Sequence, residues 1–299
     1  MDGDLNQPWW IDVLKALVII NLVMAAFAYA TWLERKLLGR MQLRYGPNRA
    51  GPFGLLQPTA DLVKLLRKES FFPASAIDVL YIAAPAVAGF TALAAFAVIP
   101  WGPVWHVGGW ASESKYSLLG SMRTAAQLVS YEVSLALSVL GVVIMGQSLS
   151  LVDIAEKQQE TIWFAGPQFV GLVCFFIAGI AETNRPPFDL PEAEQELVAG
   201  YHTEYSGMRF GLYSTAEYIN MITLSGLAVT LFFGGWGGPW LPGPIWFLIK
   251  LGGFLFVFIW MRATLPRLRY DQLMRFGWKV LLPVATLNAL VTAILVALV

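Results

Sequence analysis

Six carboxylates in one polar stretch are the residues of this sequence whose types and spacing most directly suggest chemistry. Residues 182–209 hold only two arginines beside the acidic residues Glu182, Asp189, Glu192, Glu194, Glu196 and Glu204. Prolines, leucines and Phe188 are interleaved with them, which favours a folded segment over the alternative, a solvated acidic loop. Glu192 and Glu196 are one helical turn apart, so their ionisations would be coupled if both were buried.

Two further carboxylates, Glu132 and Glu217, lie inside otherwise apolar stretches. An ionisable side chain in such surroundings is costly unless it is paired, hydrated or protonated. Both residues therefore join the acidic stretch as candidates for a proton path. The alternative is a neutral glutamic acid that hydrogen-bonds to Tyr131 or Tyr218 and only ties helices together.

Arginines near the ends of apolar stretches form the second group of candidates. They are Arg35, Arg44, Arg49, Arg123, Arg185, Arg262 and Arg267. Positive charge at such places can fix orientation in a membrane or contact lipid phosphates, and the alternative is pairing with the acidic stretch. The motif LRYGPNRAGP is rich in turn-forming glycine and proline, which favours a fixed irregular backbone for Arg44 and Arg49.

Ligands for a redox cofactor are missing from the sequence. It has one cysteine, Cys174, two histidines, His106 and His202, and no CxxC, HExxH, GxGxxG or P-loop motif. We therefore expect no metal, haem, flavin or nucleotide on this chain, and electrons for any redox reaction would come from another subunit. Twenty basic residues balance twenty acidic ones, so charge gives no reason to expect a nucleic-acid partner.

The elements that position these residues are predicted to be membrane helices. The chain is 57% hydrophobic and 13% charged, with a mean hydropathy of +0.60, which is too apolar for a water-soluble fold. We predict an all-α fold, a polytopic transmembrane bundle forming one integral membrane domain over residues 1–299. Apolar stretches near the ~20 residues of a span occur at 16–33, 79–100, 133–152, 161–181, 212–233, 245–262 and 280–299. The N-terminus lacks the basic flank and cleavage site of a signal peptide, so the first helix is expected to be retained.

The number of membrane spans predicted between the two basic loops is odd, although the loops are expected on the same side. Residues 33–69 hold eight basic against three acidic residues, and residues 262–279 hold five against one, so both loops are expected on the cytoplasmic side. An even number of spans must separate two loops on one side, but five are visible between them. The missing crossing is placed at residues 100–117, which are too short and too rich in glycine and proline to span a membrane alone.

Residues 58–68 are predicted to form a helix that lies flat in the membrane interface. Asp61, Lys64 and Lys68 make its polar face. Its apolar face consists of Leu62, Leu65 and Leu66. This division is typical of an interfacial helix. The alternative is a surface helix of a soluble domain.

Four stretches of the sequence, residues 33–58, 119–133, 179–218 and 258–283, resemble one known family. They look like the quinone-site membrane subunit, called H, of the proton-pumping NADH:quinone oxidoreductase, respiratory complex I, and the likeness extends over essentially the whole chain. The third stretch, which contains ETNRPPFDLPEAEQELVAGYHTEYSG, is highly specific because so long a polar string between two spans is hard to reach by chance.

The resemblance implies a subunit of an enzyme, with quinone as its substrate and no cofactor bound to this chain. NADH, FMN and Fe–S clusters would belong to partner subunits of the peripheral arm. The arginines above and Phe188 would line the quinone chamber. The carboxylates would begin a proton path toward small and antiporter-like membrane subunits. The implied location is the bacterial inner membrane, with lipid as a further partner and no nucleic acid.

One departure from the family concerns the same place as the parity problem. Family members usually carry an eighth span where this sequence runs from VIPWGP to GGWASESKY. Either this chain lacks that span or residues are missing from its sequence. The alternative functions are a secondary transporter that binds ions at Glu132 and Glu217, the related subunit of membrane-bound hydrogenases, and a purely structural anchor for a peripheral arm.

Overall fold

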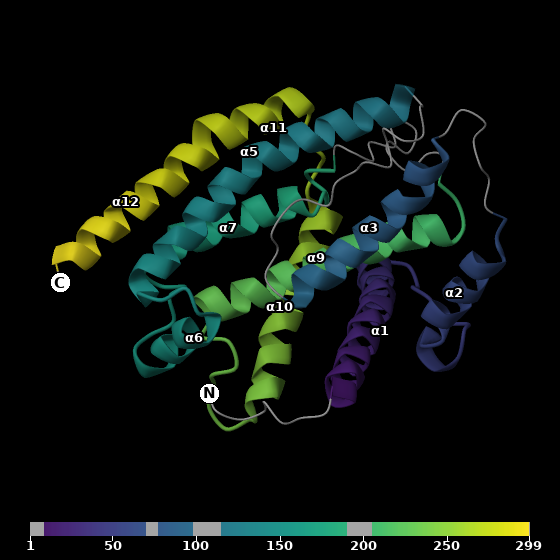
Figure 1. The fold of residues 1–299 in the computed structure, drawn as a ribbon, viewed down its shortest axis with the longest axis horizontal. Helices are drawn as coiled ribbons and strands as arrows, with labels where there is room; N and C mark the ends of the chain where they lie inside the picture. Colours follow the sequence, from purple (N-terminus) through teal and green to yellow (C-terminus); the bar gives the residue numbers. More distant parts are fainter. Residues whose placement is uncertain (1–8, 70–76, 98–114, 190–204, 299) are drawn as a thin grey trace.

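The structure, a computed structural model, describes residues 9–69, 77–97, 115–189 and 205–298. Regular structure in these residues is helical (Figure 1). The helices are α1 (Trp9–Met41), α2 (Gln57–Arg67), α3 (Asp78–Ala97), α5 (Lys115–Gly146), α6 (Leu151–Glu160), α7 (Phe169–Glu182), α9 (Met208–Phe232), α10 (Gly243–Thr264), α11 (Tyr270–Phe276) and α12 (Leu282–Leu298). A short turn, η1 (Pro52–Gly54), precedes α2, and a π-helical turn, η3 (Gly277–Leu281), joins α11 to α12.

Each of the seven predicted spans falls on a helix of this bundle. Four helices of the described chain are long and apolar enough to cross a membrane, namely Val13–Met41, Met122–Gly146, Gly243–Thr264 and Tyr270–Leu298. Shorter apolar helices cover Val79–Thr91 and Phe169–Glu182. The predicted fold class, a polytopic bundle of transmembrane helices, is therefore confirmed.

The helix α5 differs most from its predicted span. It begins at Lys115 and ends at Gly146, whereas the apolar stretch suggested 133–152. The apolar pattern is interrupted by Arg123 and by polar residues, but Gln127 and Ser130 are buried and donate hydrogen bonds to backbone carbonyls. Buried polar groups with such partners are compatible with a membrane helix, so composition alone placed the start too late.

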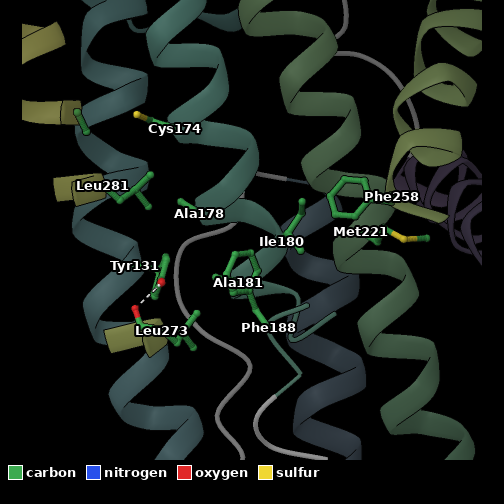
Figure 2. Packing of buried hydrophobic residues seen from close by; sticks show 11 residues of the cluster. Tyr131, Cys174, Ala178, Ile180, Ala181, Phe188, Met221, Phe258, Leu273 and Leu281 are labelled. Carbon is green, nitrogen blue, oxygen red and sulfur yellow. Dashed lines mark hydrogen bonds between the residues drawn. The ribbon is translucent and has the colours of Figure 1, made fainter. Parts of the chain in front are cut away.

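The helix α9 lies at the centre of the bundle (Figure 1). It packs against α1, α3 and α10, and also against α6 and α7. The helices α5, α7 and α12 contact one another on one side of α9. Their shared core, which includes Tyr131, Ala178 and Leu281, is drawn in Figure 2.

The described polar connections lie together at one end of the bundle, which we call the polar end. The backbone N–H of Leu268 donates to Pro187 O at 3.1 Å, and Ser206 Oγ donates to Glu69 O at 3.2 Å. The first contact joins the segments that follow α10 and α7, and the second joins the end of α2 to the start of α9. At the opposite end, Lys250 Nζ donates to carbonyls of the α9 to α10 connection.

Both α3 and α5 begin at the polar end, although they are consecutive in the described chain. Tyr81, near the start of α3, stacks on Tyr205 with ring centroids 4.4 Å apart, and Gln127 of α5 donates to Phe188 O at 2.9 Å. The helices α3 and α5 therefore run in the same direction, away from the polar end. Residues 98–114, where we placed the missing crossing, lie outside the described residues. A helix of 17 residues would reach only about 26 Å, less than the ~30 Å hydrocarbon core.

The helix α2 confirms a helix at the predicted amphipathic segment. It has no buried residue, and its leucines Leu62 and Leu66 are exposed. Its polar face is tied to α1 because Arg35 Nη1 donates to Asp61 Oδ2 at 2.6 Å. An exposed apolar face held in this way fits a helix in the membrane interface.

The first testable prediction concerns the sides of the membrane. Cysteines at Leu43 and Arg269, both exposed at the polar end, should react with a membrane-impermeant maleimide from the same side. A cysteine at Trp240, in the α9 to α10 connection, should react only from the other side. Labelling of Leu43→Cys and Arg269→Cys from opposite sides would show that the chain between α3 and α5 does not return across the membrane.

The second prediction concerns the depth of α2. Spin labels at Leu62 and Leu66 should report a hydrocarbon environment, because both apolar side chains are exposed in the described chain. A label at Lys64, on the polar face, should report water. The interfacial position is contradicted if aqueous relaxation agents reach all three labels equally.

Candidate functional site

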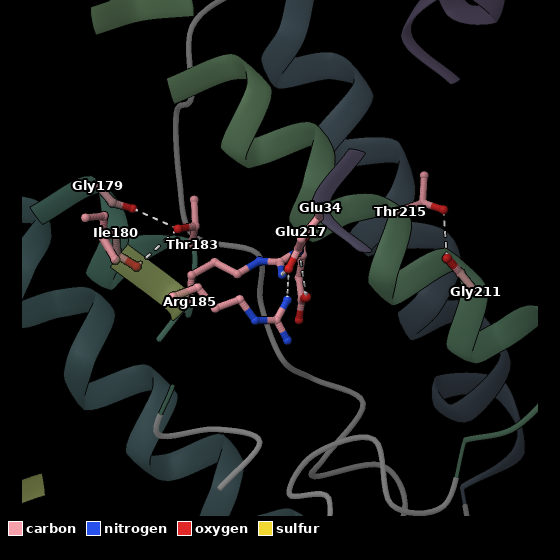
Figure 3. Close-up of polar contacts among 9 residues, drawn as sticks. Glu34, Gly179, Ile180, Thr183, Arg185, Gly211, Thr215 and Glu217 are labelled. Atoms are coloured by element: carbon pink, nitrogen blue, oxygen red, sulfur yellow. Dashed lines mark hydrogen bonds and ion pairs between the residues drawn. The ribbon is translucent and has the colours of Figure 1, made fainter. Parts of the chain in front are cut away.

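Arg185 lies between two carboxylates at the polar end (Figure 3). Its Nη1 is 3.6 Å from Glu34 Oε1, and its Nη2 is 3.9 Å from Glu217 Oε2. Arg262 Nη1 also donates to Glu34 Oε1. The guanidinium carbon of Arg185 lies 4.1 Å from the ring centre of Tyr218. We call these five residues the ion cluster.

Glu34 and Arg185 of the ion cluster are largely removed from solvent, whereas the side chain of Arg262 is 38% exposed. The side chain of Glu34 is 3% exposed and that of Arg185 is 9% exposed. Charges in such a place persist only with partners of opposite sign. Burial acts to lower the pKa of the Arg185 guanidinium, but Tyr218, Glu217 and Glu34 raise that pKa above its ordinary value. Arg185 is therefore a stable cation in this buried place.

Some hydrogen-bonding atoms of the ion cluster are unused. Glu34 Oε2 and Arg185 Nε and Nη2 are buried, and they have no hydrogen-bond partner among the described residues. A buried polar atom without a partner costs about 1–3 kcal/mol. These atoms can accept or donate a hydrogen bond to water or to a ligand without breaking an existing hydrogen bond.

The turn after α7 sets the position of Arg185. The helix ends at Glu182, where Thr183 Oγ1 donates to the last carbonyls of α7 at 3.1 Å. The N–H of Arg185 still reaches Ile180 O at 3.4 Å. Pro186 and Pro187 then prevent further helix because neither has an N–H, and the peptide bond between them is cis.

Glu34 was not predicted from the sequence, because it was counted among the residues of the basic loop. In the structure α1 continues to Met41, so Glu34 belongs to its helix. A signal was present: Val23, Phe27, Ala30 and Glu34 recur at the spacing of one helical face. Val23 and Ala30 are buried on that face, and so is Glu34. Extending the apolar periodicity past Leu33 would have identified it.

The structure brings Arg185, Glu217 and Arg262 together, but it places the other internal candidate differently. Glu132 lies on an exposed face of α5 in the single chain, so the burial expected for it is not seen there. Its neighbours Tyr131 and Ser134 take the buried positions toward the rest of the bundle. Glu182 is partly buried at the end of α7, which packs against α5.

The remaining candidates of the acidic stretch divide into two groups. Phe188 is buried and lies 5.9 Å from the ring of Tyr131, so it belongs to the core rather than to an open surface (Figure 2). Asp189 is partly buried. Four carboxylates lie outside the described residues: Glu192, Glu194, Glu196 and Glu204.

Three of the other arginines surround a cleft of about 750 Å³ at the polar end. It is lined by Arg35, Leu38, Arg44, Tyr45, Gly46, Pro47, Asn48, Arg49 and Gln57. The backbone is fixed here, since Gly54 has φ +77° and a Cβ on it would lie 2.2 Å from Pro47 O. Arg123 and Arg267 are partly buried, and Arg267 Nε and Nη2 have no hydrogen-bond partner in the described chain. No metal-binding group of three or more His, Cys, Asp or Glu occurs in the residues described.

The third prediction tests the strength of the ion cluster. Glu34→Gln should destabilise the fold by about 3 kcal/mol, because removing one member of a buried pair leaves its partners uncompensated. The measurement is an unfolding titration in detergent. Asp61→Asn, which breaks the more exposed pair with Arg35, should cost less than about 1 kcal/mol. Equal losses for the two variants would contradict this assignment of the buried charge.

The sequence is similar to H subunits of NADH-quinone oxidoreductases over nearly its whole length. A match to the family described as NADH dehydrogenase covers residues 14–107 and 104–293. The chain is 52% identical to the H 1 subunit of the NADH-quinone oxidoreductase of Geobacter metallireducens, over 94% of this chain and 95% of that relative. It is 52% identical to the H 2 subunit of the Geobacter sulfurreducens enzyme, over 93% and 94% of the two chains. Identity to the H subunit of Rhodospirillum centenum is 47%, over 97% and 95%.

These alignments also bear on the missing crossing. The first runs over 314 positions, whereas 94% of 299 residues is about 281, so about 33 positions have no residue from this chain. The Rhodospirillum centenum alignment runs over 320 positions, against about 290 residues for 97% of the chain, and about 30 positions are empty. The family match divides at residues 104–107, within the predicted gap. A shortfall of this size is enough for one membrane span.

Fold and comparisons agree on the family. The bundle has the predicted apolar helices, the family match covers most of the chain, and the relatives above are 47% to 52% identical to it over at least 93% of its length. The chain belongs to the NADH dehydrogenase family and is a relative of the H subunits of bacterial NADH-quinone oxidoreductases.

Proposed function

We propose that this chain is the quinone-binding membrane subunit of a proton-pumping NADH:quinone oxidoreductase, respiratory complex I. The observation that carries the proposal is the ion cluster, in which Arg185 is buried between Glu34 and Glu217. The names of the relatives supply the reaction, the transfer of electrons from NADH to a quinone. In this proposal NADH, FMN and Fe–S clusters are bound by partner subunits.

The chemistry of quinone reduction explains why such a cluster is useful. Two electrons place negative charge on the quinone oxygens, and in poorly solvated surroundings that charge must be met by cations and protons. Arg185 can donate from Nε and Nη2, which are free of hydrogen bonds to the described residues. When Arg185 turns toward the new charge, Glu34 and Glu217 lose part of their compensation. A carboxylate left in this way takes up a proton, which couples reduction to proton movement.

A second set of carboxylates extends the proposed path. Glu182 lies at the end of α7, which packs against α5, the helix that carries Glu132. An exposed carboxylate is costly against lipid, so we place another membrane subunit of the complex on this face of α5. Asp189 and the acidic residues outside the described chain would connect this path to the quinone chamber. The neighbouring subunits would be the small or antiporter-like ones.

The polar end also offers a surface for the peripheral arm. Leu43 is 97% exposed and Tyr45 is 92% exposed, on a connection whose backbone is fixed by Gly54. Arg44 and Arg49 lie beside them. Exposed apolar and arginine side chains on a rigid loop are typical of a protein interface. We place this end on the cytoplasmic side of a bacterial cell membrane, in agreement with its excess of basic residues.

The fourth prediction tests the proton path. Glu132→Gln combined with Glu217→Gln preserves side-chain volume but removes two groups that titrate. In the assembled complex this double variant should reduce quinone-coupled proton pumping at least about tenfold, comparable to the loss of an essential proton-transfer group. NADH oxidation by an artificial acceptor, which partner subunits serve, should be unchanged.

The matched control is Glu156→Gln, which removes an exposed carboxylate of α6 at the opposite end of the bundle. It should pump as the wild type does. Wild-type quinone reductase activity and proton stoichiometry in a correctly assembled Glu132→Gln, Glu217→Gln variant would contradict the proposed path.

A further inference from the structure

Gln127 of α5 holds the turn that carries Arg185 from both sides. Its side chain is 0% exposed, and its Nε2 donates to Ala181 O at 2.6 Å and to Phe188 O at 2.9 Å. Ala181 lies four residues before Arg185, and Phe188 lies three residues after it. One amide group therefore fixes the end of α7 and the chain beyond the two prolines.

The chemistry of this contact is demanding. A primary amide nitrogen has two hydrogens, and here each one is directed at a different carbonyl. A carboxylate at the same place has no hydrogen to donate, and a protonated carboxyl group has one. An aliphatic side chain of similar size fills the space but leaves both carbonyls without this donor. Among uncharged side chains of this length, glutamine alone can make both hydrogen bonds.

The neighbouring contacts of α5 serve other elements. Tyr131, one turn further along, donates to Leu273 O at 2.9 Å and so holds α11 (Figure 2). Trp278 Nε1 donates to Ser130 Oγ at 3.1 Å, which again ties α5 to the chain after α11. Gln127, by contrast, bonds directly to the backbone on both sides of Arg185.

We propose that Gln127 is a positioning residue for quinone reduction, which acts by setting the place of Arg185 between Glu34 and Glu217. This inference rests on the proposed function. Arg185 Nη1 and Nη2 lie 3.6 Å and 3.9 Å from their carboxylate partners, so a small displacement of the turn changes both ion pairs. The two hydrogen bonds of Gln127 restrain that displacement.

The experiment compares Gln127→Leu with Gln127→Glu in membranes that contain the assembled complex. For Gln127→Leu, the KM for a short-chain quinone should rise about tenfold at every pH, as expected for lost hydrogen bonds to buried carbonyls, while kcat changes less than about threefold. For Gln127→Glu, the rise should be about tenfold near pH 8.5 and about threefold near pH 6, because only the protonated carboxyl group donates a hydrogen bond. Each value is taken relative to the wild type at the same pH.

Gln158→Leu is the matched control. Gln158 is also buried, at the opposite end of the bundle. Its Nε2 donates a hydrogen bond to Thr230 O, and its Oε1 accepts hydrogen bonds from the N–H groups of Phe164 and Gly234. Its replacement can reduce the amount of complex, which NADH oxidation by an artificial acceptor reports, but the quinone KM of the complex that remains should be unchanged. A rise in KM equal to that of Gln127→Leu would overturn the proposal.

Two other results would also overturn it. One is an unchanged quinone KM in Gln127→Leu, or a Gln127→Glu effect that does not vary with pH. The other is loss of assembly in both Gln127 variants but not in Gln158→Leu, which would show a structural role only. Arg185→Gln, measured in parallel, separates this inference from the proposed function. If Arg185→Gln leaves quinone kinetics unchanged, the proposed function itself is wrong.

Discussion

A cation buried between two carboxylates is the constraint on which the polar end of this bundle depends. The chain after α7 supplies Arg185, while α1, α9 and α10 supply Glu34, Glu217 and Arg262. An uncompensated charge is costly in a poorly solvated bundle, so the four segments, far apart in sequence, must keep their relative positions. The same arrangement is responsive, because a change of charge nearby alters the balance among all four side chains. The same contacts therefore determine the stability of the fold and the proposed response to quinone reduction.

Composition and periodicity predicted the helices well, since each apolar stretch must be shielded from water in the same way. They failed where polar residues are buried. The start of α5 was missed because Gln127 and Ser130 interrupt the apolar pattern, although both donate hydrogen bonds to backbone carbonyls. The pairing of Arg185 with Glu217 was not predictable, since it depends on how α7 and α9 pack. Glu34 was within reach, because the helical spacing of α1 places it on the buried face.

Three independent observations concern the connection between α3 and α5. Charge counting required one more span than the sequence shows, and the two helices begin at the same end of the bundle. The relatives align over about 30 positions that have no residue here, and the family match divides at residues 104–107. The alignments show that this chain is shorter than its relatives, and the family match divides within residues 98–114. The ion cluster is built from segments on both sides of that place, so its assembly requires that both halves of the chain keep one orientation.

The most direct test of the central claim is to observe the carboxylates of the ion cluster during reduction. Infrared difference spectra of the complex, recorded as the quinone is reduced, report carboxyl groups that gain or lose a proton. Isotope-edited exchange in D2O identifies the bands. The account predicts a protonated-carboxyl band that appears on reduction in the wild type and is absent from Glu217→Gln. Identical difference spectra for the two proteins would contradict a role for this buried cluster in coupling quinone reduction to protons.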